Sequence, residues 1–272
     1  MSALACIMLD RGFVVQGSDM QDSSITEKLR KRGIPIVIGH TKETISRKVN
    51  LVIVSSAISK DNPEIMRALE LGIPIVKRSY ALGQLMRRSR GIAIAGTHGK
   101  TTTTSMITLI AKNAGLDPVA LIGGEVRNIG GNFLSGKGKY FIAEACEYDR
   151  SFLDMYPEIA VITNIEEDHL DYYKDIRDIM VSFEKFVRHI PREGLLVISA
   201  DDQNACRVAR AAKCHVVGYG FSARSKQHDI FNTYWEIEEV QQNSGETVFA
   251  INNDDIVAHF RLRIPGKHNV SN

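Results

Sequence analysis

Cysteine is scarce in this sequence, and its few copies show no shared pattern. Four cysteines occur among 272 residues, and they lie far apart without the C-x-x-C spacing of many zinc and redox sites. We therefore expect neither a disulfide framework nor a cysteine-based zinc site. Reduced thiols are typical of cytoplasmic proteins, so we expect a cytoplasmic location.

Long apolar runs and an excess of one charge are also missing. No run approaches the roughly 20 residues of a membrane-spanning helix, and the start lacks a signal-sequence pattern, so we expect no membrane insertion. The net charge is only +2 without a dense Lys/Arg stripe, so nucleic acid is not an expected partner. With 44% hydrophobic and 24% charged residues, the composition predicts one large or two ordinary globular domains.

The most informative stretch is an apolar run, a glycine-bounded turn and a helical pattern that follow one another at residues 91–104. Its centre is Gly96-Thr97-His98-Gly99-Lys100-Thr101, which we call the glycine loop. Glycines let backbone N–H groups approach an anion, and a helix N-terminus adds partial positive charge. Lys100 would add a full charge, and the Thr101 hydroxyl can bind the Mg²⁺ that accompanies nucleotide phosphates. The stretch therefore predicts a nucleotide site.

The glycine loop departs from the general phosphate-loop pattern, G-x-x-x-x-G-K-[ST]. Ile94 stands where the first glycine of that pattern should be, which disfavours an ordinary P-loop kinase or GTPase. A chance Gly-Lys-Thr at a helix start is the alternative. The position between an apolar strand and a helix favours phosphate binding over that alternative.

Strand-like and helix-like segments alternate along the first 88 residues. The most continuous apolar run there, residues 51–56, predicts a central parallel strand. The alternation predicts a parallel doubly wound sheet, a Rossmann-like domain over residues 1–88. Further strands are expected at residues 13–17, 33–39 and 72–76.

An arginine-rich segment at residues 87–90 marks the expected boundary to a second domain. Residues 89–272 are predicted to form a central P-loop ATPase α/β domain, so the whole chain belongs to the α/β class. Beyond Gly220 the partial alternation predicts antiparallel strands added to the parallel sheet, at residues 230–240, 247–251 and 256–264. The glycine-rich segment 123–138 is expected to be a long loop.

Polar residues follow two of the expected N-terminal strands. Ligands of doubly wound sheets bind at the carboxyl ends of the strands, and Asp19 and Ser55 lie at such ends. An ordinary turn aspartate is the favoured alternative for Asp19, and Ser55 is equally explained as a strand-end polar residue.

Acidic residues and a histidine follow two expected strands of the second domain. Glu144 emerges first from its strand, so it is the preferred carboxylate for Mg²⁺, whereas Glu147 and Asp149 are interpreted as loop charges. His169 lies in an acidic loop after the next strand, where metal or phosphate binding and a structural role are equally expected.

Four motifs together resemble the Mur ligase family, and they span the chain in the right order. They are Gly96-Thr97-His98-Gly99-Lys100-Thr101-Thr102-Thr103, Glu144-Ala145-Cys146-Glu147, Thr163-Asn164-Ile165-Glu166-Glu167-Asp168-His169-Leu170-Asp171 and Gly266-Lys267-His268-Asn269-Val270-Ser271-Asn272. The Thr-His-Gly-Lys-Thr form and Glu-Ala-Cys-Glu-Tyr point to the alanine-adding branch or the murein peptide ligases.

The resemblance implies a reaction and a set of roles. ATP would phosphorylate the lactyl carboxylate of UDP-N-acetylmuramic acid, and L-alanine would attack the acyl phosphate. By the same resemblance Lys100, Glu144, Asn164 and His169 would be catalytic. Thr101, Glu144 and His169 would hold Mg²⁺, and Asp19 and Ser55 would lie on the UDP-sugar side. The residues that would bind ATP are Gly96, Thr97, His98, Gly99, Lys100, Thr101, Thr102, His268, Asn269 and Asn272.

The chain also departs from that family at both ends. Family members begin with a strand and a glycine-rich loop that ends in Met-Ser, whereas Met1-Ser2 stands first here. The third domain of the family would begin after Asn272. We therefore expect a first domain without its first strand, a second domain incomplete at its C-terminus, and little or no ligation. A murein peptide ligase and a nucleotide-binding module without catalysis remain the alternatives.

Overall fold

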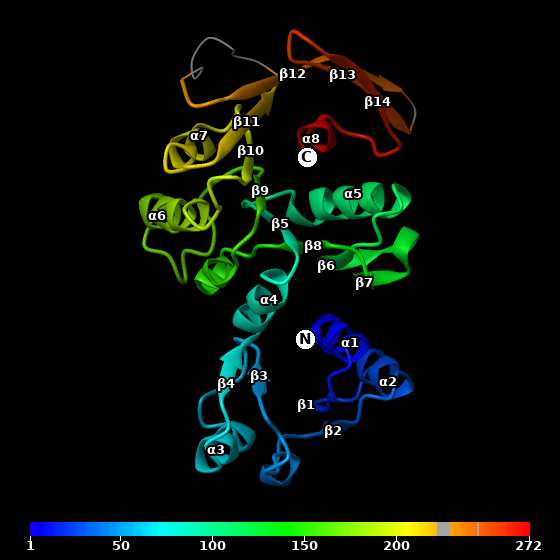
Figure 1. Ribbon diagram of the computed structural model, residues 1–272, viewed down its shortest axis with the longest axis vertical. Helices are drawn as coiled ribbons and strands as arrows, with labels where there is room; N and C mark the ends of the chain where they lie inside the picture. Colours follow the sequence, from blue (N-terminus) through cyan, green and yellow to red (C-terminus); the bar gives the residue numbers. More distant parts are fainter. Residues whose placement is uncertain (222–228, 244) are drawn as a thin grey trace.

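The computed structural model describes residues 1–221, 229–243 and 245–272. Its main feature is a ten-stranded sheet with helices on both faces, and the N-terminal elements lie at one end of that sheet (Figure 1). The mixed α/β class expected from the sequence is confirmed.

The N-terminal elements form two separate pairs of parallel strands. β1 (Gly17–Asp19) pairs with β2 (Ile36–Ile38), and β3 (Val52–Val54) pairs with β4 (Ile75–Lys77). The parallel direction agrees with the prediction, but the two pairs share no strand within the described residues. The intervening elements are α1 (Ser2–Asp10), α2 (Ser24–Lys31), η1 (Lys42–Thr44), α3 (Pro63–Glu70) and α4 (Arg78–Met86).

Two details of the N-terminal prediction are wrong. Of the segment 13–17, only Gly17 belongs to a strand. Val14 is fully exposed, and the pairing begins where the Gly17 N–H donates to the Pro35 carbonyl. The run at residues 51–56 is not central either, since β3 has β4 as its partner and lies in a two-stranded sheet. Apolar character alone did not distinguish an edge from a centre.

The large sheet is built around β5 (Arg90–Ala95). Its order is β14-β13-β12-β11-β10-β9-β5-β8-β6-β7, so β5 lies between β9 (Ile159–Ile162) and β8 (Tyr140–Glu144). The remaining strands are β6 (Val119–Val126), β7 (Gly131–Ser135), β10 (Leu195–Ser199), β11 (His215–Gly220), β12 (Thr233–Asn243), β13 (Glu246–Asn252) and β14 (Val257–Leu262). The helices are α5 (Lys100–Asn113), η2 (Arg127–Ile129), η3 (Tyr148–Asp154), α6 (Ile176–Val187), α7 (Gln203–Ala209) and α8 (Lys267–Ser271).

The register of the parallel strands brings three strand ends together. Ile94 of β5 is opposite Glu144 of β8, and Ala95 is opposite Ile162 of β9. Because all three strands run in the same direction, the segments that follow them emerge at one edge of the sheet.

Each face of the sheet has its own apolar core. On one face, α5 packs through Ala111 against Ile94, Ala120 and Ile142. On the other, α6 contributes Phe183 and Phe186, which contact Phe152 of η3 at ring-centre distances of 5.0 and 4.9 Å. All three rings are fully buried, so this aromatic cluster anchors the segment that follows β8.

The glycine-rich segment 123–138 is not the long loop that the sequence predicts. β6 continues to Val126, and β7 returns antiparallel to it, with Leu121 opposite Phe133. A Cβ at Gly136 would collide with the Asp117 carbonyl, so this glycine serves close approach of two backbones within a hairpin.

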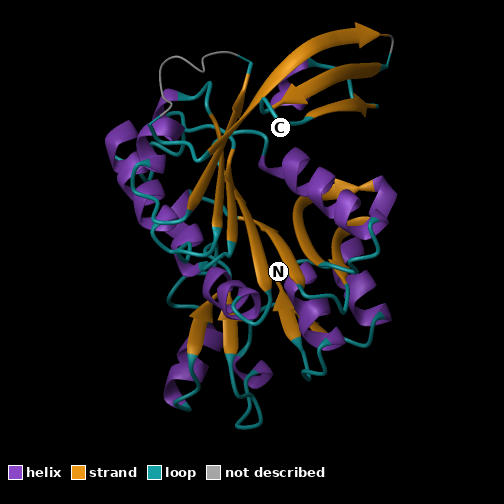
Figure 2. Cartoon of the chain, turned by 45° about the horizontal axis from the view of Figure 1, so that its top comes forward, coloured by secondary structure: helices purple, strands orange, loops and turns teal. Residues whose placement is uncertain are grey.

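The predicted addition of antiparallel strands is confirmed. β12 runs parallel to β11 and then pairs antiparallel with β13, which pairs antiparallel with β14. These strands extend past the parallel part of the sheet, and α8 lies beneath them beside α5 (Figure 2).

The structure also bears on the cysteines and on membrane-spanning helices. All four cysteines are free thiols. Among the described residues, no helix combines the length and apolar character needed to cross a bilayer.

Truncating the aromatic cluster should destabilise the chain. Phe183→Ala should lower the free energy of unfolding by about 3 to 5 kcal/mol, because a buried ring leaves a cavity. Val181→Ala on the exposed side of the same helix is the control and should change it by less than about 0.5 kcal/mol. Urea titrations followed by circular dichroism measure both; equal values would contradict the assigned core.

Candidate phosphate-binding site

The glycine loop connects β5 directly to α5. Gly96 and Gly99 have φ angles of +130° and +85°, which residues with a Cβ rarely adopt. A Cβ on Gly96 would also collide with the Thr163 hydroxyl, and one on Gly99 with the Asn272 side chain. Both glycines are therefore required by conformation and by space, and they lead the backbone into the N-terminus of α5.

The end of β9 fixes the backbone of the glycine loop. The Asn164 side chain accepts a hydrogen bond from the His98 N–H at 2.8 Å and donates one to the His98 carbonyl at 3.1 Å. The Thr163 hydroxyl donates to the same carbonyl at 2.6 Å, and the Thr97 N–H donates to the Asn164 carbonyl at 3.0 Å. The loop is thus held in one shape by hydrogen bonds within the protein.

A further layer of polar residues holds the segment after β9. Asp202, at the start of α7, accepts from the Ile165 N–H at 3.1 Å, and Asn204 donates to the Ile165 carbonyl at 2.9 Å. The Thr97 hydroxyl oxygen accepts from the Glu166 N–H at 2.9 Å. Sequence reasoning missed Thr163, Asp202 and Asn204 as supports of the loop, because only the tertiary structure brings α7 to it.

The ammonium group of Lys100 already has three acceptors. Its Nζ donates to the Gly96 carbonyl at 2.5 Å, to the Thr97 carbonyl at 3.0 Å and to Glu147 Oε1 at 3.0 Å. An ammonium group has three N–H donors, so these contacts use its full capacity. The side chain is 16% exposed.

Glu147 is a buried acid in the structure, not the loop charge predicted from the sequence. Its side chain is 3% exposed, and its buried Oε2 atom has no hydrogen-bond partner among the residues that the structure describes. His169 Nε2 lies 3.7 Å from Glu147 Oε1 and 3.8 Å from Asp168 Oδ2. Glu147, Asp168 and His169, which we call the Glu147 cluster, each offer one ligand atom within 4.8 Å of the others.

The backbone around Glu147 is constrained on several sides. Asp149 and Arg150 have φ angles of 52° and 53°, and His169 has 54°, a left-handed conformation that is unfavourable for residues with a Cβ. The Tyr173 hydroxyl donates to the Glu147 carbonyl at 2.5 Å, and burial raises the pKa of Tyr173 to about 12, so the hydroxyl stays a donor at neutral pH. Lys77 holds Asp149 at 2.6 Å.

Glu144 and Thr101 each lie beside the Gly123-Gly124 segment of β6. Glu144 Oε1 accepts from the Gly123 N–H at 2.5 Å, and the adjoining Gly124 faces the Thr101 methyl group. In the described part of the chain, no hydrogen bond or ion pair joins either residue to His169. The roles of Thr101, Glu144 and His169 as metal ligands therefore stay predictions, as does that of the neighbouring Thr102.

The C-terminal helix α8 reaches the glycine loop. The Thr103 hydroxyl donates to the Asn272 carbonyl at 3.1 Å, and the Asn272 side chain faces Gly99. Asn269 is 7% exposed and donates to the Pro265 carbonyl at 2.7 Å, whereas His268 lies against Gly266. The structure thus brings Asn272 to the loop, and contact of His268 and Asn269 with a nucleotide stays a prediction.

Asp19 and Ser55 follow β1 and β3, as the sequence predicts. Asp19 is exposed, and its Oδ1 accepts from the Gln21 N–H at 3.2 Å, which is a turn interaction. Ser55 is half-buried, and its carbonyl accepts from the Ile58 N–H. Among the described residues neither makes a contact with the glycine loop, so their substrate role stays a prediction.

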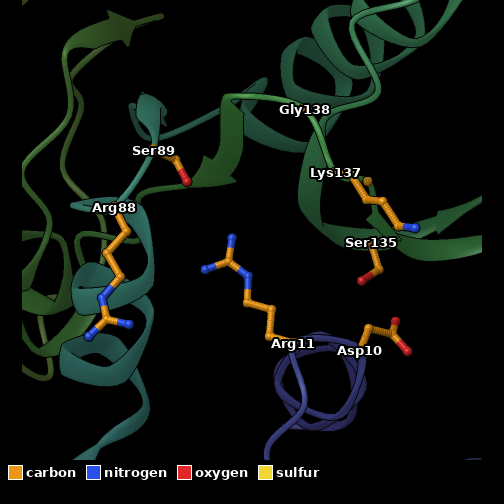
Figure 3. A pocket seen from close by; sticks show the side chains of 8 residues that line it. Asp10, Arg11, Arg88, Ser89, Ser135, Lys137 and Gly138 are labelled. Atoms are coloured by element: carbon orange, nitrogen blue, oxygen red, sulfur yellow. The ribbon is translucent and has the colours of Figure 1, made fainter.

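A cavity of about 560 Å³ lies away from the glycine loop, between α1 and the connection from β7 to β8. Arg11, Arg88 and Lys137 line it, but only Arg11 extends into the middle, and the head groups of Arg88 and Lys137 point elsewhere (Figure 3). These cations do not converge, so the cavity is not an evident anion site.

Comparison with known families agrees with this geometry. The Mur ligase middle domain matches residues 94–272, and the Mur ligase family catalytic domain matches residues 1–90. The chain belongs to the Mur ligase family. The resemblance carried by the sequence motifs is therefore confirmed.

Individual proteins of the family are similar to this chain in sequence and in structure. The UDP-N-acetylmuramate–L-alanine ligases of Acetivibrio thermocellus and Clostridium acetobutylicum are 45% and 46% identical over the whole chain, which spans 57% and 58% of their lengths. The solved structure of the UDP-N-acetylmuramate-alanine ligase of Thermotoga maritima matches with a TM-score of 0.81 at 29% identity. The match covers all of this chain and 60% of that one. A Neisseria ligase for UDP-N-acetylmuramate and L-alanyl-gamma-D-glutamyl-meso-diaminopimelate matches with a TM-score of 0.85 at 26% identity, covering 100% of this chain and 86% of that one.

Adding a Cβ to the glycine loop should impair ATP binding. Gly99→Ala should weaken it by at least about tenfold, because the new methyl group displaces Asn272 and the loop. Gly115→Ala at the other end of α5 is the matched control: its φ is also positive, at +72°, but the surrounding space is open. Both variants should lose about 1 to 2 kcal/mol of stability from backbone strain. Calorimetric titration with ATP should separate them; equal ATP affinities would contradict the packing of Asn272 on the loop.

Proposed function

We propose that the protein carrying this chain is an ATP-dependent ligase that joins L-alanine to UDP-N-acetylmuramic acid in the cytoplasm. The observation that carries the proposal is Lys100 at the start of α5, where its ammonium group contacts the glycine loop and Glu147, with His169 beside Glu147. The names of the relatives at 45% and 46% identity supply the substrates.

The proposed chemistry has two steps. A carboxylate oxygen of the sugar nucleotide attacks the γ-phosphorus of ATP, the bond to the bridging oxygen breaks, and ADP leaves. The amine of L-alanine then attacks the carbonyl carbon of the acyl phosphate, inorganic phosphate leaves, and the nitrogen loses a proton. Both steps gather negative charge, so positioned cations and N–H donors accelerate them.

Each part of the site has a task in this scheme. The N–H groups at the start of α5 and the Lys100 ammonium would bind the ATP phosphates. Asn164 keeps the glycine loop in shape through His98. The Glu144 carboxylate and the Thr101 hydroxyl offer the oxygen ligands that Mg²⁺ prefers, and together with His169 they would hold this ion, which neutralises phosphate charge when bound.

A murein peptide ligase is the second candidate. It is favoured by the match to the Neisseria ligase, whose name specifies a tripeptide in place of L-alanine. Parallel reactions with L-alanine and with that tripeptide distinguish the two candidates, because only the accepted amine yields a product of increased mass.

The ligase proposal can be tested with the full coding sequence of the protein. ATP, Mg²⁺, UDP-N-acetylmuramate and L-alanine should give ADP and the amide product, measured by mass spectrometry. Lys100→Ala should lower the rate at least about 100-fold, because a donor to the transferred phosphoryl group is lost. Lys112→Ala is the control, since Lys112 is an exposed lysine at the other end of α5. A Lys100→Ala variant with normal turnover would refute the proposal, and ATP binding without ligation by the normal chain would favour a non-catalytic nucleotide module.

A further inference from the structure

In the structure, protein acceptors occupy the Lys100 ammonium group that is proposed to bind the ATP phosphates. The ammonium group has no free donor, because two loop carbonyls and Glu147 take all three. A phosphate that binds Lys100 must therefore displace at least one of these acceptors. The two carbonyls belong to the glycine loop itself, which moves with the lysine, whereas Glu147 belongs to the segment after β8.

Glu147 is held in place beside Lys100, so it can compete with a phosphate for the ammonium group. Its carbonyl accepts from the buried Tyr173 hydroxyl at 2.5 Å and from the Arg150 N–H at 3.0 Å. Arg150 is in turn paired with Asp178 at 2.8 Å. The backbone of Glu147 is therefore anchored, so its carboxylate could follow Lys100 toward a phosphate only by rotation of its own short, buried side chain.

The departure of Lys100 would leave Glu147 in an unfavourable state. The side chain is 3% exposed, and within the described part of the chain Oε2 has no hydrogen-bond partner even while Lys100 is present. A buried carboxylate without a countercharge is strongly destabilising. A cation held by Glu147, Asp168 and His169 would remove that penalty, since each of the three offers one ligand atom. This set shares only His169 with the residues proposed above for Mg²⁺.

We propose that Glu147 is a latch on Lys100: it holds the lysine away from phosphate in the free protein and releases it when a divalent cation neutralises the carboxylate. The inference rests on the proposed ATP-binding function. The latch would couple the two ligands: neutralising Glu147 with a divalent cation would free Lys100 for ATP, and ATP would by reciprocity strengthen cation binding.

The decisive measurement is the affinity of the 272-residue chain for ATP, first in EDTA and then with Mg²⁺. Glu147→Gln keeps the shape and removes the charge, so it should bind ATP in EDTA about tenfold more tightly, the equivalent of one hydrogen bond to a charged group. The additional gain in affinity on adding Mg²⁺ should shrink in this variant. A merely structural role for Glu147 would instead weaken both affinities together, and a role as metal ligand alone would leave the EDTA affinity unchanged; either result would overturn the latch.

Two controls isolate the contact with Lys100. Glu167→Gln makes the same charge change at an exposed site in the acidic loop and should leave the EDTA affinity nearly unchanged. In a Lys100→Ala background, Glu147→Gln should have no further effect, as a double-mutant cycle requires. An equal gain in that background, or from Glu167→Gln, would assign the effect to general electrostatics and refute the latch.

A second variant protects the test against misfolding. Tyr173→Phe removes only the hydroxyl that holds the Glu147 carbonyl, so it should tighten ATP binding in EDTA about twofold. If Glu147→Gln does not fold, an unchanged affinity for Tyr173→Phe overturns the proposal. Failure of the normal chain to bind ATP under either condition would refute the proposed ATP site as well, whereas normal ATP binding with no effect of Glu147→Gln refutes the latch alone.

Discussion

The pairing of β5 with β8 on one side and β9 on the other determines where the rest of the site lies. Because the three strands are parallel and in register, their carboxyl ends bring the glycine loop, Glu144 and Thr163 to one edge of the sheet. The aromatic core beneath, built from Phe152, Phe183 and Phe186, fixes the segment after β8 to α6. The position of Glu147 is therefore a consequence of core packing.

The site combines a rigid part with an adjustable one. Hydrogen bonds from Asn164 and Thr163 hold the backbone of the glycine loop at His98, so its N–H groups are oriented in advance. Lys100 is the adjustable part, since its long side chain can exchange acceptors without moving the backbone. In the proposed function, this division would keep a phosphate site preformed while Glu147 engages the charge of Lys100.

The sequence predicted much of the fold, and its errors have physical causes. Parallel strands, the helix after the glycine loop and the antiparallel addition follow from local periodicity, which is set by each segment alone. The hairpin of β6 and β7 was missed because glycines indicate a loop, although Gly136 is needed for close approach to Asp117. The run at residues 51–56 was placed at a sheet centre because apolar character does not reveal how many neighbours a strand has.

For the site, the sequence by itself determined the family and predicted the glycine loop as a phosphate site, because the conformations of Gly96 and Gly99 and the charge of Lys100 are local properties. Only the tertiary structure decided the partners. Glu147 and Lys100 are 47 residues apart, and Thr103 and Asn272 are 169 apart, so no local pattern could join them. Burial is likewise a tertiary property: the motif that contains Glu144 and Glu147 offers two similar carboxylates, and the fold buries Glu147 beside Tyr173, whose hydroxyl donates to the Glu147 carbonyl.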